Sequence, residues 1–319
     1  MEGVDRETAK YLRHVSTSFA PLTYAFAYGS GMFQQSGHKS TRNNMLDFVF
    51  VVDDATTWHR ENILAHPHHY SGMRHLGAPR IAHIQNRYGA AIYFNTLVPF
   101  EGRMIKYGVI DTEHFLRDMH TWETLYVSGR LHKPVVVVAG AEDERMQDAV
   151  GGNLTSALET SLLMLPEQFT EVELFTCITG LSYSGDVRMI VGEDKGKVNN
   201  IVAPNIHKFR ELYADVIAAN ASLCRTEGIL TQDLDPKVQS EYVNRLPSTL
   251  RSHVVHTLGS ASQNVVDRES CRRGVVEGLH NVVRRSSTSQ TAKGVVTAGV
   301  NKSVVYGLQK LRKMVKSMR

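Results

Sequence analysis

The sequence predicts an α/β protein, in detail an α+β arrangement in which helices surround a mixed sheet and a mainly helical second domain follows. Residues 24–31 and 45–53 form two apolar runs joined across a glycine-rich turn and a polar segment, a pattern typical of two neighbouring buried strands. Residues 90–98 and 103–110 form two more strand-like runs, and the short spacer with Pro and Gly between them favours a hairpin. A hairpin beside the first two strands indicates a mixed or antiparallel sheet.

Length and composition divide the chain into three parts. At 319 residues it exceeds one ordinary core, so we expect a sheet domain over 1–150, a helical domain over 151–285, and a linker with a C-terminal amphipathic helix over 286–319. Hydrophobic residues make up 42% and charged residues 21%, as in folded globular proteins. The 3 cysteines give no disulfide framework and suit a reducing compartment. No apolar run approaches the roughly 20 residues that span a bilayer, so any membrane contact is expected to be peripheral.

The turn between the first two strands is the strongest chemical signal. Gly29 and Gly31 remove side-chain bulk where a backbone could approach a phosphate, and Ser30 offers a hydroxyl and an amide. Asp47 opens the second strand, where a carboxylate could hold a divalent metal on a triphosphate. A plain structural corner and a strand-entry residue are the alternatives for these positions. The combination favours nucleotide chemistry, because α/β folds bind ligands at adjacent strand ends.

The segment 55–88 is polar and rich in histidine. Without nearby cysteines or a tight helical histidine pair, zinc is the weaker interpretation. A partly exposed helical insertion that covers the nucleotide site is the favoured one.

At the N-terminus, the acids Glu2, Asp5 and Glu7 are unlike the acid-poor start of a transit peptide.

Basic residues near the later strands are candidates for phosphate binding. Lys106 lies inside the second hairpin strand, where a solvated strand face is the ordinary alternative. Residues 112–126 have the apolar spacing of a helix with Thr112 as its N-cap and its aromatic side chains in the core. In the loop before the strand 135–138, Arg130, His132 and Lys133 could form a cationic clamp for a triphosphate or a lipid phosphate.

Beyond a charged boundary segment at 141–152, helices are predicted at 154–165 and 171–181, then a short strand at 185–190 and a turn at 192–196. Two helices followed by a strand and turn are compatible with a winged-helix-like module. On a strand, Asp186 and Arg188 would point the same way. The region lacks a dense basic recognition helix, so no nucleic-acid partner is expected.

The C-terminal segment has the composition of a membrane-surface helix. From Ser286 onward there are seven basic residues and no acid, and subtracting them from the net +4 leaves −3 for the rest of the chain. From Lys302 to Arg319, apolar residues recur at intervals of four and three opposite a basic face. This pattern suits an anionic membrane surface. A core-docking helix or a disordered tail are the alternatives. The Ser- and Thr-rich stretch 286–297 reads as a linker.

Several blocks carry a family resemblance. The glycine-serine turn followed by an acid-bearing strand resembles the nucleotidyltransferase superfamily. More specifically, the chain resembles the mitochondrial CDP-diacylglycerol synthases (phosphatidate cytidylyltransferases) of the translocator assembly and maintenance, or Tam41, family. The similar blocks run from the start of the chain past residue 200 and are 28–35, 47–53, 69–71, 93–97, 105–109, 129–134 and 181–189.

The resemblance implies an activity and a site. CTP and phosphatidic acid would give CDP-diacylglycerol and pyrophosphate with Mg²⁺, feeding phosphatidylglycerol and cardiolipin synthesis on the matrix side of the mitochondrial inner membrane. The implied catalytic residues are Asp47, Lys106 and Asp186, with Asp47 and Asp186 on the metal. The implied substrate-binding residues are Gly29, Ser30, Gly31, Arg130, Lys133, Arg188 and, more weakly, Lys197.

One position departs from the superfamily pattern. Val49 stands where a second acid is usual, and Asp53 lies six residues beyond Asp47, roughly 20 Å along a strand. Asp186 and then Asp111 are the candidates to complete the metal site. Two alternatives stay open: a nucleotidyltransferase with a soluble acceptor, and a noncatalytic maintenance factor for inner-membrane translocases.

Overall fold

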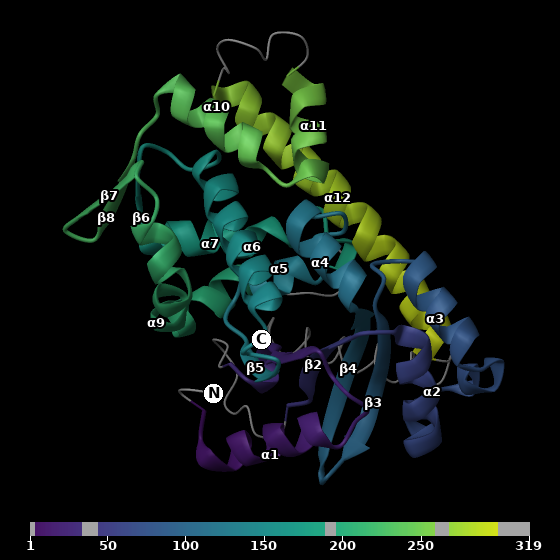
Figure 1. The fold of residues 1–319 in the computed structure, drawn as a ribbon. Coiled ribbons are helices and arrows are strands. Elements are labelled where there is room, and N and C mark those ends of the chain that lie inside the picture. Colours follow the sequence, from purple (N-terminus) through teal and green to yellow (C-terminus); the bar gives the residue numbers. More distant parts are fainter. Residues whose placement is uncertain (1–3, 34–43, 189–195, 259–267, 299–319) are drawn as a thin grey trace.

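A five-stranded mixed sheet forms the centre of the N-terminal half (Figure 1). The computed structural model describes residues 4–33, 44–188, 196–258 and 268–298. Strands run in the order β3-β4-β2-β1-β5, with β2 parallel to β4 and the other neighbours antiparallel. The predicted hairpin and mixed sheet are confirmed. The strands are β1 (Tyr24–Tyr28), β2 (Leu46–Val52), β3 (Tyr93–Phe100), β4 (Arg103–Asp111) and β5 (Val136–Ala139).

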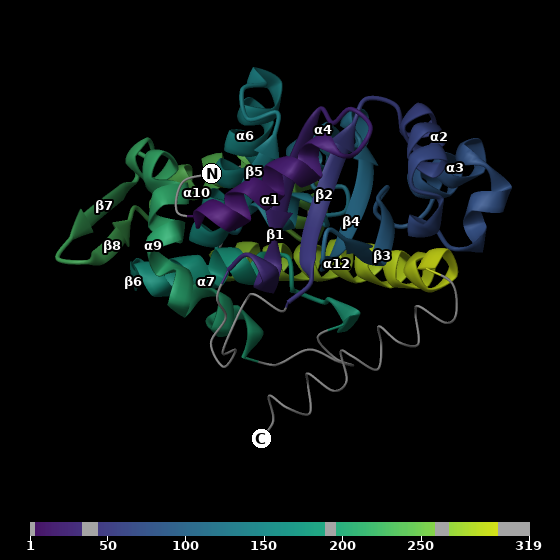
Figure 2. The ribbon, with the colours of Figure 1, turned by 90° about the horizontal axis from the view of Figure 1, so that it is seen from below.

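The two faces of the sheet bury different side chains because strand residues alternate in direction. On one face, Phe48 and Phe50 pack with α1 (Arg6–Thr17) and α2 (Ala55–Ala65). Figure 2 shows α1 lying over the strands. On the other face, Val49 and Val51 pack with α4 (Thr112–Thr121), α5 (Ser128–Leu131) and the start of α6 (Glu144–Leu162).

The histidine-rich insertion forms α2, two short 3₁₀ turns, η2 (Pro67–His69) and η3 (Gly72–Leu76), and α3 (Ala78–Arg87). The expectation of a lid over Asp47 and Lys106 is wrong. His59 and His69 are buried and belong to a hydrogen-bonded group around Tyr107. Tyr107 follows Lys106 in β4 and therefore points to the opposite face.

The second half is helical with a small three-stranded sheet. Its order α6-β6-α7-α9-β7-β8, with strand order β6-β8-β7, is that of a winged-helix module, but none of these strands is the one predicted at 185–190. Residue 150, the predicted boundary, lies inside α6, whose first turns pack on the large sheet and whose later turns join the helical core. The remaining elements are β6 (Gln168–Thr170), α7 (Glu171–Leu181), α9 (Lys197–Ala218), β7 (Leu223–Thr226), β8 (Ile229–Gln232), α10 (Pro236–Arg245) and α11 (Ser248–Leu258).

The linker predicted over 286–297 is wrong: this stretch belongs to α12 (Arg268–Ala298), a continuous helix of 31 residues. It runs from α11 to β3 and α3 (Figure 1). Buried Gln290 accepts from the Ala90 amide at 2.9 Å and donates to the Ile92 carbonyl at 3.1 Å. Lys293, assigned to the basic tail from the sequence, is also buried and donates to the Gln85 and Tyr88 carbonyls. The predicted membrane helix, Lys302 to Arg319, lies outside the described residues.

Candidate active site

Asp47 and Lys106 face each other at the start of two adjacent parallel strands. They are register partners in β2 and β4, and the Lys106 Nζ lies 3.3 Å from Asp47 Oδ1. The side chain of Asp47 is 20% exposed and that of Lys106 is 15% exposed, so the pair is half-buried but reachable from solvent. Lys106 is therefore not an ordinary solvated strand lysine. The pair places a carboxylate and an ammonium together at the strand ends where the sequence predicts phosphate chemistry.

The glycine-serine turn is a 3₁₀ turn, η1 (Gly29–Gly31), directly beside that pair. Gly29 has φ +79°, a left-handed conformation that favours glycine, and a Cβ there would lie 3.5 Å from Asp47 Oδ2. A Cβ on Gly31 would lie 2.6 Å from the Met45 carbonyl, which leaves no room for a side chain. The Ser30 carbonyl accepts from Asn44 Nδ2 at 3.1 Å. Both glycines are thus required by the geometry that brings the turn against Asp47.

Arg130 lies on the same side of the sheet, but in helix α5 rather than in the predicted loop. Its guanidinium carbon is 4.0 Å from the centre of the Tyr126 ring and 5.3 Å from that of Tyr28. One guanidinium nitrogen also donates to the Tyr126 carbonyl. Because Tyr28 is the register partner of Asp47, Arg130 lies beside the Asp47–Lys106 pair. The structure therefore brings these predicted residues into one site.

Lys133 and Lys197 share a second tyrosine. Their ammonium groups lie 5.1 Å and 5.2 Å from the Tyr183 ring centre, and Lys133 also donates to Ser182 Oγ at 2.9 Å. Lys197 is the first residue of α9. Burial, together with the charges of Arg130 and Arg188, lowers the pKa of Lys133 to about 7. The prediction that His132 belongs to the cationic clamp is wrong. His132 is fully buried against Asn153, and burial lowers its pKa to about 3, so it is a neutral structural side chain.

Asp186 and Arg188 bind each other. The predicted strand at 185–190 is wrong over its described residues, because Val187 and Arg188 are helical. Arg188 Nε lies 2.9 Å and 3.1 Å from the two Asp186 oxygens, and the Arg188 amide donates to Oδ1 at 2.9 Å. Burial favours the neutral acid, but the hydrogen bonds and charge of Arg188 outweigh it and lower the pKa of Asp186. Arg188 in turn lies 5.6 Å from the Tyr126 ring centre. The turn predicted at 192–196 lies outside the described residues apart from Gly196, the N-cap of α9.

Asp111 is not close to Asp47. The parallel register pairs Asp47 with Lys106 and Val52 with Asp111, so Asp111 is five residues, roughly 16 Å, further along the sheet. It binds His114 Nδ1 at 2.7 Å and, in place of the predicted Thr112, is the N-cap of α4. Within the described ranges, no three His, Cys, Asp or Glu side chains are grouped closely enough to hold a metal ion. Asp47 alone still fits Mg²⁺ delivered with a nucleotide, because Mg²⁺ commonly takes one or two carboxylates and completes its shell with phosphates and water.

Three tyrosines in this site were missed by sequence reasoning. Tyr126 was assigned to a helical core face, but α4 ends at Thr121 and Trp122 has a left-handed backbone with φ +52°. Tyr28 and Tyr183 carry no distinctive spacing. Tyr28 directly precedes the predicted site residue Gly29, and Tyr28 and Tyr183 both lie within blocks of the family resemblance, 28–35 and 181–189. That position was the available signal.

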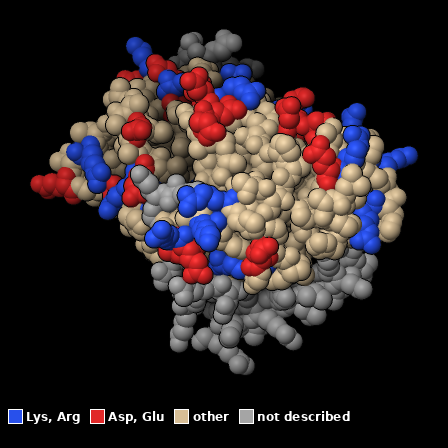
Figure 3. Space-filling view, turned by 60° about the horizontal axis from the view of Figure 1, so that its bottom comes forward, with Lys and Arg blue, Asp and Glu red and all other residues tan. Residues whose placement is uncertain are grey.

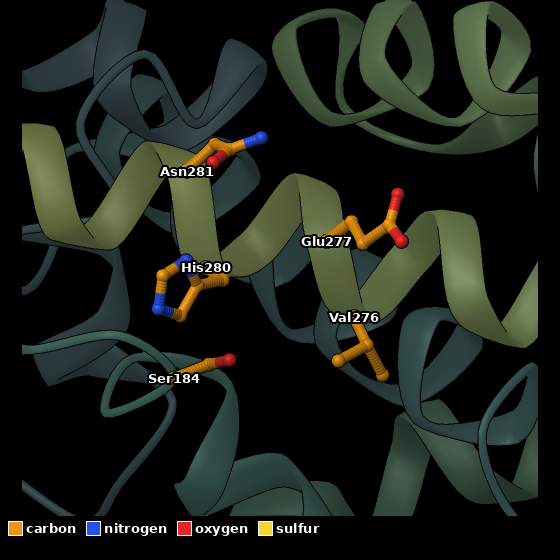
Figure 4. Close-up of a pocket in the computed structure, with 5 residues that line it drawn as sticks. All are labelled: Ser184, Val276, Glu277, His280 and Asn281. Atoms are coloured by element: carbon orange, nitrogen blue, oxygen red, sulfur yellow. The ribbon is translucent and has the colours of Figure 1, made fainter.

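The surface has a basic region and a pocket. Figure 3 shows Lys and Arg side chains gathered near the centre of one face, next to groups of Asp and Glu. A separate pocket of about 380 Å³ lies between Ser184 and the α12 residues Val276, Glu277, His280 and Asn281 (Figure 4). It contains none of the predicted site residues. Gly185, next to Ser184, has φ +78° and packs on His280, so α12 lies behind the segment that carries Tyr183 and Arg188.

A mixed sheet with a glycine-serine turn, an acid on the next strand and converging cations define a nucleotidyltransferase-like α+β protein. The family model described as "Phosphatidate cytidylyltransferase, mitochondrial" (Tam41_Mmp37) matches residues 12–313, and the chain belongs to this family. The Xenopus laevis protein named mitochondrial phosphatidate cytidylyltransferase is 46% identical to this chain, over 95% of this chain and 94% of the relative. The Danio rerio protein of the same name is 43% identical, over 98% of this chain and 97% of the relative. The Bos taurus protein of that name is 46% identical, over 92% and 90%.

Proposed function

We propose that this chain is a phosphatidate cytidylyltransferase, which converts CTP and phosphatidic acid to CDP-diacylglycerol and pyrophosphate. Family membership over nearly the whole chain supports the activity. The observation that carries it to particular residues is the Asp47–Lys106 pair beside the Gly29 turn, with Arg130 next to it. An acid that can hold a metal, a turn whose two glycines leave its backbone accessible, and adjacent cations are what a triphosphate needs.

The reaction forms one phosphorus–oxygen bond and breaks another. A phosphate oxygen of phosphatidic acid attacks the α-phosphorus of CTP, the α–β anhydride bond breaks, and its electron pair leaves with pyrophosphate. A phosphate monoester is already largely ionised near neutral pH, so the site needs little general-base catalysis. Its contribution is alignment and charge neutralisation.

Named residues would divide this work. The backbone of Gly29, Ser30 and Gly31 would hold phosphate oxygens, and Lys106, Arg130, Lys133, Arg188 and Lys197 would bind negative charge on both substrates. Asp47 would bind Mg²⁺, which when present neutralises the phosphates. The role of Asp186 as a second metal ligand stays a prediction. Its carboxylate binds Arg188 in the structure, which supports a role in orienting that guanidinium.

We also propose that the protein works at the matrix side of the mitochondrial inner membrane, with Lys302 to Arg319 on the anionic lipid surface. The relatives are named mitochondrial, and the basic composition of this segment supports the membrane contact. None of the helices in the described ranges combines the length and the apolar run that crossing a bilayer requires.

The test is CDP-diacylglycerol formation from labelled CTP and phosphatidic acid in liposomes with Mg²⁺. Asp47→Asn should lower kcat/KM by at least about 100-fold, since the metal-binding charge is lost. Asp53→Asn is the matched control, because Asp53 is exposed just beyond the other end of the same strand. Truncation after Ala298, which leaves α12 complete, should weaken activity on liposomes.

Each alternative has its own result. An inactive, folded wild type would contradict the synthase and favour a noncatalytic maintenance factor. Transfer of CMP to a soluble acceptor, unaffected by the truncation and absent on liposomes, would favour the soluble-acceptor enzyme. An Asp47→Asn variant as active as wild type would remove Asp47 from the site.

A further inference from the structure

Tyr126 is held in place by a rigid turn. The buried carboxylate of Asp118 accepts hydrogen bonds from the amides of Thr124, Leu125, Val127 and Ser128, all at 2.9–3.0 Å. These bonds fix the backbone on both sides of Tyr126. A side chain on such a turn presents its ring in a defined position with little further loss of conformational entropy.

The ring of Tyr126 contacts residues from three elements. Arg130 of α5 lies 4.0 Å and Arg188, after α7, lies 5.6 Å from its centre. Phe94 of β3 meets it edge-on at 6.4 Å between ring centres, and the Lys106 ammonium lies 4.6 Å from the Phe94 ring. Tyr126 is thus the link between the sheet end that carries Lys106 and the segment that carries Arg188.

Two guanidinium groups beside one ring need an attractive partner, because like charges repel. An aromatic face attracts a cation within about 6 Å of its centre, and both distances fall within that limit. The charges also act on the phenol. Burial alone would raise the pKa of Tyr126, but Arg130, Arg188 and Lys106 outweigh it and lower that pKa to about 8.

We propose that Tyr126 is a positioning residue: the face of its ring gathers the guanidinium groups of Arg130 and Arg188 so that both can bind the phosphates of one nucleotide. This inference rests on the proposed function and adds to it a residue that contacts the arginines rather than the reacting atoms. Each arginine has further anchors: the Tyr28 ring and the Tyr126 carbonyl for Arg130, and Asp186 for Arg188. Loss of the ring should therefore misplace the arginines rather than expel them.

The test replaces Tyr126 in the full chain by Phe, Leu and Met. Phe keeps the aromatic face without the hydroxyl, whereas Leu and Met fill space without an aromatic face. The control is Tyr88→Leu, because Tyr88 is 58% exposed and lies outside the site. Steady-state kinetics with phosphatidic acid liposomes give KM for CTP and kcat. Equilibrium binding of a fluorescent CTP analogue gives a readout independent of turnover.

We expect Tyr126→Phe to stay within about twofold of wild type. Tyr126→Leu and Tyr126→Met should raise both KM for CTP and the dissociation constant about tenfold, with a smaller change in kcat. The inference is overturned if Phe is as impaired as Leu, since the hydroxyl would then be the active feature, or if Leu or Met binds CTP like wild type. If the Tyr126→Leu variant does not fold, the Tyr126→Met variant alone tests the inference. An inactive wild type that binds no CTP contradicts the proposed function instead.

Discussion

Lys106 and Tyr107 are neighbours in β4, yet they belong to two very different polar regions. Lys106 faces a charged, partly open group with Asp47, Arg130 and Arg188. Tyr107 faces a closed, neutral group on the other side of the sheet, in which its hydroxyl meets His69 Nδ1 at 3.0 Å and accepts from Asn62 at 2.9 Å. Both regions are rich in titratable side chains. Charge and access to solvent separate them.

The neutral region shows what structural histidines look like. His59 is fully buried, its ring nitrogens bind the Tyr70 hydroxyl at 2.7 Å and the Gln85 amide oxygen at 2.9 Å, and burial lowers its pKa to about 4. Such a group holds the insertion α2–α3 on the sheet. On the site face, by contrast, cations lie close together, an arrangement whose repulsion an anionic substrate would relieve. The comparison teaches that the hydrogen-bond partners and the exposure of a titratable side chain indicate whether it has a functional role, whereas the residue type alone does not.

Of the two neighbours in β4, Lys106 has the larger expected effect on activity. Replacing it by Met keeps the strand packing but removes the cation proposed to bind the substrate phosphates, so kcat/KM should fall about 100-fold with little change in stability. The measurement is the liposome assay combined with urea unfolding. Arg103→Met is the matched control, because Arg103 is in the same strand but lies over Tyr11 on the opposite face of the sheet. Equal losses in both variants would remove the distinction between the two faces.

An effect of the opposite kind is expected at Tyr107. Tyr107→Phe leaves the buried amide of Asn62 and ring of His69 short of a partner, so the free energy of unfolding should fall by about 1–3 kcal/mol. Activity per folded molecule should stay unchanged, because Tyr107 faces away from the site. Urea unfolding and the same assay measure the two quantities, with Tyr88→Phe as an exposed control. A large drop in kcat at unchanged stability would place the neutral region in catalysis.

The sequence predicted the parts of this site that depend on local pattern. Two continuous apolar runs and a glycine pair were enough to predict β1, the turn at η1 and β2, and to put Asp47 at the turn. Positions decided by distant contacts were not predictable. The Ser- and Thr-rich residues 286–297 looked like a linker, but in α12 their hydroxyls bond back to carbonyls one turn earlier, as Thr291 does to Ser287, and the helix packs on β3. Asp186 and Arg188 show the same limit, because a capping interaction replaced the predicted strand.

The smallest expected effect is a difference in pH dependence between the two regions. Lys133, with a pKa of about 7, loses its charge as pH rises through neutrality, whereas His59, with a pKa of about 4, stays neutral throughout. The charge with which Lys133 is proposed to bind phosphates is present below pH 7 and lost above it. KM for CTP should therefore rise severalfold between pH 6 and 8.5, less than the tenfold that a loss of about 1.4 kcal/mol would give. Lys133→Arg keeps its charge over this range and should remove the part of the rise that Lys133 causes. The part that remains belongs to the titration of CTP and of Tyr126, whose pKa is about 8. A pH profile that is identical in wild type and Lys133→Arg would show that Lys133 stays protonated and that the charged region does not respond to neutral pH.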